Sequence, residues 1–275
     1  MPGQKNAALI TGACSGIGLA ISGELAKRGY SLVMVSNEEE RLVKEAKKLE
    51  SRFSVKAVTL CLDLAKNDSA QNLFCYCQDN GIKIDILVNN AGLFFFKDVI
   101  DTPVEQIEKI INLHILTPAM LSRFFARQMT DENRKGYILN MASISSRMMM
   151  PGITLYSSTK SFIRCFSRAM RNEVYKKDVS ITAISPGAVA TGLYNLPSGY
   201  LKLGMRLGII MSPERLAFLA VKKTLQRRAE YIPGGFINRL FIFIVNIMPE
   251  VLIRRIKKKI DSKLQKQKYS INPQL

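Results

Sequence analysis

Between Ala7 and Ile184 the chain alternates between short, largely apolar runs and longer amphipathic segments. The runs have the length of β-strands and lack the regular polar positions of a strand with one face in water. We expect strands at residues 7–11, 32–35, 55–60, 84–88, 137–141 and 179–184, and helices at 16–29, 38–52, 69–80, from 102 onward and at 156–177. Buried strands joined by helices form a parallel sheet covered on both faces, so the alternation predicts a doubly wound α/β fold.

Two of the expected helix ends are marked by residues that typically begin or end a helix. Thr102 followed by Pro103 is typical of a helix start, with Thr102 as the N-cap. Gly81 is typical of a helix end in the left-handed conformation. Neither a linker nor an internal repeat precedes residue 235, so we expect one domain over residues 1–235 and an extension over 236–275.

The segment between the first expected strand and helix is rich in glycine. It reads Thr11-Gly12-Ala13-Cys14-Ser15-Gly16-Ile17-Gly18. Glycine allows a tight turn and a close backbone approach to a pyrophosphate, and the helix N-terminus adds free N–H groups and a partial positive charge. A nucleotide-binding loop is therefore one interpretation, and a plain strand-to-helix turn is the other. Three residues separate Gly12 from Gly16, so the spacing differs from G-x-G-x-x-G.

Further motifs follow this loop in a fixed order. Residues 11–18 match the TGxxxGIG loop of the short-chain dehydrogenase/reductase family, 89–92 resemble its NNAG motif, 156–160 its YxxxK motif and 185–191 its segment after the sixth strand. The resemblance covers roughly residues 5–235. It implies a Rossmann fold and hydride transfer between a nicotinamide dinucleotide and a ketone or secondary alcohol.

By this resemblance the catalytic residues are Asn112, Ser143, Tyr156 and Lys160. Tyr156 and Lys160 are four positions apart and share one face of a helix. A phenol has an ordinary pKa of about 10, and a neighbouring ammonium lowers it. Tyr156 then exchanges a proton with the substrate oxygen, and Ser143 donates a hydrogen bond to it. The resemblance also implies that Lys160 holds the nicotinamide ribose and that Asn112 anchors a water in a proton relay. His114, the only histidine, is expected to pack in the interior rather than to react.

The resemblance also implies which residues bind the cofactor. They are Gly12, Ser15, Gly16, Ile17, Gly18, Ser36, Asn37, Asp63, Leu64, Asn90, Ala91, Gly92, Tyr156, Lys160, Pro186, Gly187, Val189 and Thr191. Asp63 has an alternative reading as the N-cap of the third helix. One histidine and five scattered cysteines indicate that no metal site is built here.

NADP(H) is favoured over NAD(H) as the cofactor. The second strand ends in Val35-Ser36-Asn37, without the acid that binds the ribose hydroxyls in NAD enzymes of the family. The basic residues typical of NADP enzymes are missing as well. Ser36 and Asn37 are small enough to receive a 2′-phosphate, and Arg41 is close enough in sequence to reach it.

Three apolar segments favour a lipophilic substrate. They are the expected lid at 193–211, which carries only Lys202 and Arg206 as charges, together with Met148 to Met150 and Phe94 to Phe96. A lid that buries its own side chains is the alternative. The order of motifs resembles the family branch of long-chain 3-ketoacyl, 3-ketosphinganine and 17-ketosteroid reductases, which implies a long-chain 3-keto lipid. The other functions to be tested are a soluble dehydrogenase of small alcohols, steroids or sugars, and a non-catalytic NADP-binding scaffold at a membrane.

The charge of the chain is concentrated near its C-terminus. The net charge is +18, and residues 222–275 hold thirteen Lys or Arg against three acids. An apolar stretch at 236–245 precedes a basic stretch at 253–268, a pattern typical of a peripheral anchor on an anionic membrane. The alternatives are packing on the core or on a second subunit, with the basic end as a solvated face. Nucleic acid is not expected, because Tyr269 is the only aromatic residue after Phe243.

The chain is expected in the cytoplasm, associated peripherally with the cytoplasmic face of a membrane. Only four apolar residues follow the first six, so we expect no signal peptide. Phe236 to Ile253 is the closest approach to a spanning segment, but polar and charged residues interrupt it. The family resemblance further implies a homodimer or homotetramer.

Overall fold

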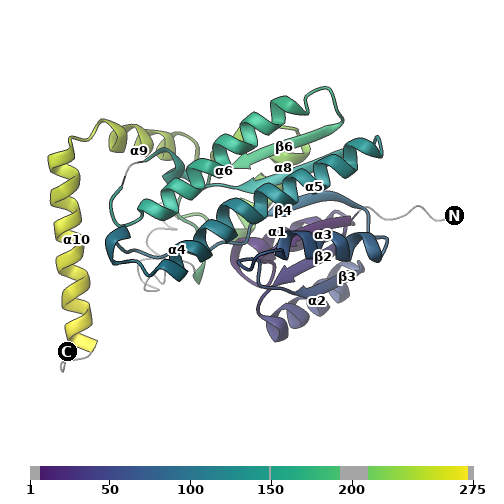
Figure 1. The fold of residues 1–275 in the computed structure, drawn as a ribbon, viewed down its shortest axis with the longest axis horizontal. Helices are drawn as coiled ribbons and strands as arrows, with labels where there is room; N and C mark the ends of the chain where they lie inside the picture. Colours follow the sequence, from purple (N-terminus) through teal and green to yellow (C-terminus); the bar gives the residue numbers. More distant parts are fainter. Residues whose placement is uncertain (1–6, 149, 193–209, 272–275) are drawn as a thin grey trace.

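The computed structural model describes residues 7–148, 150–192 and 210–271. Its centre is a seven-stranded sheet with strand order β3-β2-β1-β4-β5-β6-β7, and every neighbouring pair is parallel (Figure 1). The strands are β1 (Ala7–Thr11), β2 (Ser31–Ser36), β3 (Ala57–Cys61), β4 (Ile84–Asn89), β5 (Gly136–Met141), β6 (Val179–Ile184) and β7 (Glu230–Tyr231). The first six lie where the sequence predicts them, and no strand end is shifted by more than two residues. The seventh was not predicted, because two residues carry no hydrophobic pattern.

Helices cover both faces of the sheet, which confirms the doubly wound α/β fold. One face carries α1 (Gly16–Lys27), α2 (Glu39–Phe53) and α8 (Pro213–Leu225), and the other carries α3 (Ser69–Asp79), α4 (Val104–Ile111), α5 (Thr117–Asp131) and α6 (Thr154–Glu173). Gly81 has a φ of +62° after α3, as its predicted role as a helix stop requires. After β7 the chain continues into α9 (Gly235–Ile247) and α10 (Glu250–Ile271).

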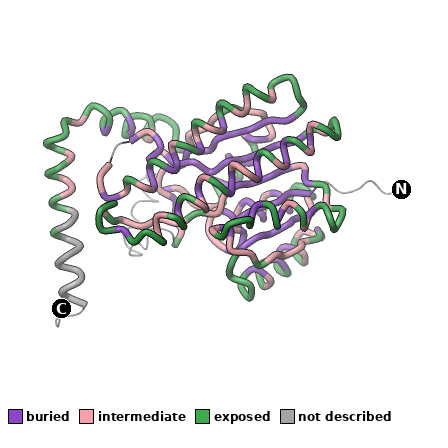
Figure 2. The backbone as a smooth tube through the Cα atoms, viewed as in Figure 1, coloured by how far each residue is buried: buried purple, intermediate pink, exposed green. Residues whose placement is uncertain are grey.

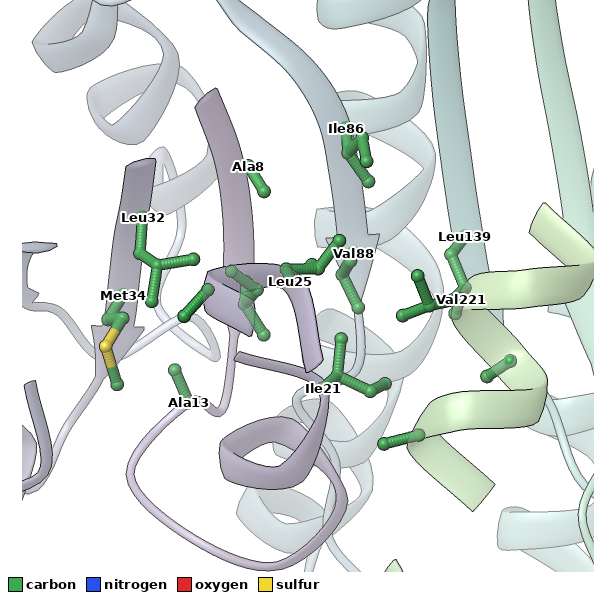
Figure 3. Packing of buried hydrophobic residues seen from close by; sticks show 14 of the residues in the cluster. Ala8, Ala13, Ile21, Leu25, Leu32, Met34, Ile86, Val88, Leu139 and Val221 are labelled. Carbon is green, nitrogen blue, oxygen red and sulfur yellow. The ribbon is translucent and has the colours of Figure 1, made fainter. Parts of the chain in front are cut away.

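The core is divided between the two faces of the sheet. On one face, Ile21 and Leu25 of α1 and Val221 of α8 lie against residues such as Val88 and Leu139 (Figure 3). On the other face, Leu73 of α3 and Leu121 and Phe125 of α5 pack against the same strands. Each fully buried Leu or Ile contributes roughly 1.5–3 kcal/mol. Because the central strands are buried on both sides, their runs are apolar without alternation.

The region after Thr102 differs from the prediction in two ways. Pro103 occupies the N-cap position and α4 begins at Val104, while the Thr102 hydroxyl donates to the Asp98 carbonyl at 2.7 Å. Thr102 is therefore not the N-cap. The expected long helix is also interrupted by a π-helical turn, η2 (Asn112–Leu116), between α4 and α5. Helical periodicity does not reveal one inserted residue within an apolar segment.

The extension packs on the rest of the molecule through only part of its surface. Ile242 and Val245 of α9 are buried against Met148, whereas much of α9 and of residues 250–259 in α10 is exposed (Figure 2). The sequence predicts Met148 near the substrate pocket. That prediction is wrong, because the Met148 side chain packs against Ile242 and Val245 of α9 and does not line the cavity. In the described part of the chain no single helix meets the length and apolarity needed to cross a bilayer. Helices α9 and the first part of α10 meet them only as a pair bent by 108°.

The predicted lid falls almost entirely outside the described residues. Within its range the structure describes only Ile210, which is buried, and Met211, which bridges to Val189.

Candidate active site

A cavity of about 680 Å³ lies where the carboxyl ends of β1, β4, β5 and β6 meet. This is the point where the strand order reverses, the usual position of a ligand in an open parallel sheet. The volume falls within the roughly 300–1,000 Å³ typical of ligand sites. Ser143, Tyr156 and Lys160 line the cavity together with every predicted cofactor-binding residue except Gly18.

The glycines of the first loop have separate tasks. Gly12 and Gly16 have φ values of +66° and +52°, which other residues rarely adopt. A Cβ on Gly18 would lie 2.1 Å from the Gly12 carbonyl oxygen, so Gly18 allows α1 to pack against the loop. Gly18 therefore contacts the backbone of the loop at Gly12 and does not line the cavity.

The glycine loop is fastened to the loop after β4 by Thr11. The Thr11 hydroxyl accepts from the backbone N–H groups of Asn90 and Ala91 at 2.9 and 3.0 Å, and donates to the Val88 carbonyl at 3.2 Å. The Asn90 side chain returns a hydrogen bond to the Thr11 carbonyl at 2.9 Å. The sequence motif that contains Thr11 does not predict that its side chain joins the two loops.

Tyr156 and Lys160 lie one turn apart on α6 and are both buried, as their spacing predicts. The Lys160 Nζ lies 5.7 Å from the Tyr156 ring centroid and donates to the Met141 carbonyl at 3.0 Å. Burial lowers the pKa of Lys160 to about 8, because the charged form is removed from water. The Tyr156 ring also meets the ring of Phe94 edge-on, at a centroid distance of 5.0 Å.

Ser143 lies two positions after the end of β5, is buried and lines the cavity. Its Oγ accepts from the Ser145 backbone N–H at 3.1 Å. Since that contact uses a lone pair, the hydroxyl hydrogen is available for a substrate oxygen.

His114 connects the loop after β4 to helix α6. Its Nε2 accepts from the Leu93 N–H at 3.0 Å, and its Nδ1 lies 2.9 Å from the Thr159 hydroxyl, which donates to the Tyr156 carbonyl at 2.9 Å. Because Nε2 is an acceptor, the neutral ring carries its proton on Nδ1 and donates to Thr159. Burial, with a further effect of the Lys160 charge, holds the pKa of His114 well below its usual range. The interior packing predicted for His114 is confirmed, and its link to Tyr156 was missed.

Asn112 is the only predicted catalytic residue that does not line the cavity. The side-chain amide of Asn112 donates to the Ala65 carbonyl at 3.0 Å. The backbone carbonyl of Asn112 accepts from the Thr117 N–H across the π-turn. The side chain thus fixes the loop after β3 against η2. A part for Asn112 in a proton relay stays a prediction.

The far end of the cavity is lined by polar residues after β2 and β3. Ser36, Asn37 and Arg41 line it, although the Ser36 hydroxyl is already engaged with the Cys14 Sγ at 3.0 Å. Asp63 also lines it and accepts from the Ala65 N–H at 3.0 Å. The N-cap position of α3 is held by Asp68, so the alternative reading of Asp63 as that cap is wrong.

The apolar wall of the cavity is only partly as predicted. Phe94 and Phe95 line it, whereas the Phe96 ring packs over Gly152, where a Cβ would lie 2.3 Å from its Cζ. The prediction that Phe96 adds apolar surface to the pocket is therefore wrong. Several further residues line the cavity that the sequence does not predict, because they belong to no family motif: Leu62, Leu93, Gln106, Lys109 and Leu113.

The doubly wound sheet, the glycine loop at its first turn and the buried Tyr156–Lys160 pair beside Ser143 define a dinucleotide-binding oxidoreductase. Residues 6–196 match the family model described as short chain dehydrogenase. The chain belongs to the short-chain dehydrogenase family.

Two named relatives illustrate the similarity in sequence. The chain is 36% identical over 191 residues to very-long-chain 3-oxoacyl-CoA reductase-B of Danio rerio, covering 68% of this chain and 60% of the relative. It is 31% identical over 261 residues to the Homo sapiens very-long-chain 3-oxoacyl-CoA reductase, covering 93% of this chain and 79% of the relative. The first match thus spans less than two thirds of that relative's length.

Solved structures agree with the fold. A structure from work on 7β-hydroxysteroid dehydrogenase stereoselectivity superposes with a TM-score of 0.81 at 25% identity, covering 91% of this chain and 96% of that one. A short-chain dehydrogenase from Sphingobium yanoikuyae in complex with NADPH superposes with a TM-score of 0.75 at 26% identity, covering 84% and 89%.

Proposed function

We propose that the chain is an NADP(H)-dependent reductase that converts the ketone of a lipophilic, long-chain 3-keto substrate into a secondary alcohol. The observation that carries this proposal is that Ser143, Tyr156 and Lys160 line the same cavity as the glycine loop. The relatives named as very-long-chain 3-oxoacyl-CoA reductases support the substrate class.

The residues present fit a nicotinamide dinucleotide. The left-handed glycines at 12 and 16 leave room for a pyrophosphate at the start of α1, where helical N–H groups favour an anion. Arg41 lines the far end of the cavity and would receive a 2′-phosphate beside Asn37. Glu38 lies there as well, but its carboxylate is 3.4 Å from the Arg41 guanidinium. The NADPH complex of a family member supports this cofactor.

Each catalytic side chain has a task in ketone reduction. When bound, the reduced nicotinamide supplies the hydride that reaches the carbonyl carbon. Ser143 donates its hydroxyl hydrogen to the carbonyl oxygen and orients it. Tyr156 gives its phenolic proton to the same oxygen as negative charge develops there. Lys160 places positive charge beside the phenolate that remains.

The substrate class is tested with a series of 3-oxoacyl thioesters of increasing chain length, with a short polar ketone for comparison. Consumption of NADPH is followed at each length. We expect kcat/KM to rise with chain length, because Phe94 and Phe95 add apolar contact. Equal or better turnover of the short polar ketone would overturn the lipid assignment and favour a dehydrogenase of small alcohols.

The cofactor preference is tested at Arg41. In Arg41→Gln the ratio of kcat/KM for NADPH to that for NADH should fall about tenfold, since a charge-assisted contact to the 2′-phosphate is lost. Lys44→Gln is the matched control, because Lys44 is exposed on the same helix and does not line the cavity. An unchanged ratio in Arg41→Gln would contradict this assignment.

We propose further that residues 236–275 form an extension of a catalytic domain at 1–235 and bind the surface of an anionic membrane. Nine large apolar side chains are exposed on α9 and the start of α10: Phe236, Ile237, Leu240, Phe241, Phe243, Ile244, Ile247, Val251 and Leu252. Arg255, Lys258 and Lys259 follow on α10 and are exposed as well. Apolar surface next to basic side chains favours the interface of an anionic bilayer.

Flotation with vesicles containing phosphatidylglycerol tests the membrane proposal. Phe236→Ser combined with Phe243→Ser should release the protein from the vesicles, whereas Tyr175→Ser, an exposed aromatic after α6, should not. Size-exclusion chromatography runs in parallel. Loss of a dimer in the Phe variant, with no flotation of the wild type, would overturn the proposal and show that the face joins two subunits.

A further inference from the structure

A second cavity lies beside α9 and has no assigned role. It has a volume of about 360 Å³ and is lined by Arg147, Glu230, Tyr231, Ile232, Arg239 and Ile242. None of these residues lines the larger cavity that holds Tyr156. It is therefore formed separately, between the 3₁₀ turn η3 (Ile144–Arg147), the end of β7 and α9.

The charge around this second cavity is not balanced. Glu230 contacts Arg147, accepts from the Arg164 Nε at 3.0 Å and lies 4.0 Å from an Arg168 nitrogen. Three guanidinium groups thus share one carboxylate, and two positive charges remain. Arg239 adds another charge from α9 and makes no ion pair with any residue that the structure describes.

Arg147 also lacks an acceptor for part of its guanidinium. One of its terminal nitrogens reaches Glu230, but the other, Nη1, is buried without a hydrogen-bond partner in the described part of the chain. A buried charged donor without an acceptor is costly. The excess positive charge around the cavity therefore favours an anion there, and the guanidinium of Arg147 is only partly satisfied by Glu230.

The excess charge also selects the kind of anion. A carboxylate brings one negative charge, whereas a phosphate monoester brings up to two and offers several oxygens to guanidinium groups. Ile232 and Ile242 form an apolar side of the cavity, and Phe243, four positions after Arg239, is exposed. A phosphate attached to an apolar group matches this combination.

We propose that this second cavity binds a phosphate group between the guanidinium groups of Arg147 and Arg239. The phosphate comes either from a lipid headgroup or from a soluble phosphate compound, and the same guanidinium groups would hold both. The site does not depend on the reductase proposal, because it shares no residue with the larger cavity.

Calorimetric titration of the full chain tests the site. The probes are dihexanoyl phosphatidic acid below its micelle concentration, inorganic phosphate, and hexanoate as a carboxylate of similar size. The variant is Arg239→Gln, since Arg239 is exposed and unpaired among the described residues, so its replacement leaves the fold intact. Arg215→Gln is the matched control, because Arg215 is exposed on α8 and lines neither cavity, and its replacement removes the same charge.

We expect a phosphate probe to bind the wild type and Arg215→Gln equally, and Arg239→Gln about tenfold or more weakly. Binding of the lipid probe alone identifies a headgroup as the source, and equal binding of both phosphate probes identifies a soluble phosphate. The proposal is overturned if neither phosphate probe binds, if hexanoate binds as tightly, or if the two Arg variants lose affinity equally. A phosphate bound only in the larger cavity would not respond to Arg239→Gln, and that outcome also counts against the proposal.

Discussion

At the scale of single residues, the cavity depends on side chains that hold its lining in place as well as on the lining residues themselves. Tyr156, Lys160 and Ser143 were predictable, because their spacing along the chain belongs to a motif. His114 was assigned only to the interior. Its partners Leu93 and Thr159 lie 21 and 45 positions away, and no local pattern encodes such contacts.

The pH dependence of stability tests the role of His114. Its pKa is lowered in the folded protein, so below about pH 6.5 the unfolded chain binds one more proton than the folded one. The free energy of unfolding should therefore fall on acidification, with a contribution of up to about 1.4 kcal/mol per pH unit. Urea unfolding between pH 5 and 8 should show a shallower slope in His114→Gln. Equal slopes would contradict a buried neutral histidine, and since the chain holds one histidine, no other imidazole can mask the result.

Thr11 provides a second test at this scale. Thr11→Val removes the acceptor of two backbone N–H groups, from Asn90 and Ala91, and should lower the free energy of unfolding by about 2–4 kcal/mol. Thr11→Ser keeps the hydroxyl and should cost no more than about 1 kcal/mol. Urea midpoints compare the two variants. Similar losses in both would mean that the methyl group, and not the hydroxyl, is what matters.

At the scale of elements, the sequence reveals structure where a period extends over several residues. The long strands and helices α1, α2, α3 and α6 follow from such patterns. The π-turn at Asn112–Leu116 and the two-residue strand β7 do not, because each depends on tertiary partners. β7 is fixed by pairing with β6 and by the arginines around Glu230.

Removal of the Glu230 charge should therefore loosen this edge of the sheet. Burial alone would raise the pKa of Glu230, but the hydrogen bonds and charges of Arg147 and Arg164 outweigh it and lower that pKa. The stabilisation is present above the ordinary carboxyl range and is lost as the pH falls through the lowered pKa.

Glu230→Gln leaves two half-buried guanidinium groups without a carboxylate, at a cost of about 2–4 kcal/mol at neutral pH. The more exposed pair Arg227–Asp178 is the control, and Asp178→Asn should cost less than about 1 kcal/mol. Thermal unfolding at pH 7 measures both. Equal effects would show that the Glu230 cluster is no more than a surface ion pair.

At the scale of the whole molecule, the chain combines a doubly wound sheet with the apolar helix α9 and the basic helix α10. The α/β architecture follows from the sequence, and so does the concentration of charge after residue 222. The course of the extension does not, since the 108° bend between α9 and α10 and the docking of Ile242 beside Met148 depend on three-dimensional packing. The second cavity likewise arises from η3, β7 and α9, which are far apart in sequence.

We infer that this chain is an enzyme whose proton donor is Tyr156. The most direct measurement compares wild type with Tyr156→Phe for NADPH binding and for NADPH oxidation with a long-chain 3-oxoacyl thioester. We predict that Tyr156→Phe binds NADPH with little change but oxidises it at least about a hundredfold more slowly, because general acid catalysis contributes roughly that much or more. Undiminished oxidation in Tyr156→Phe would contradict the account, and NADPH binding without oxidation in the wild type would identify the chain as a nucleotide-binding scaffold.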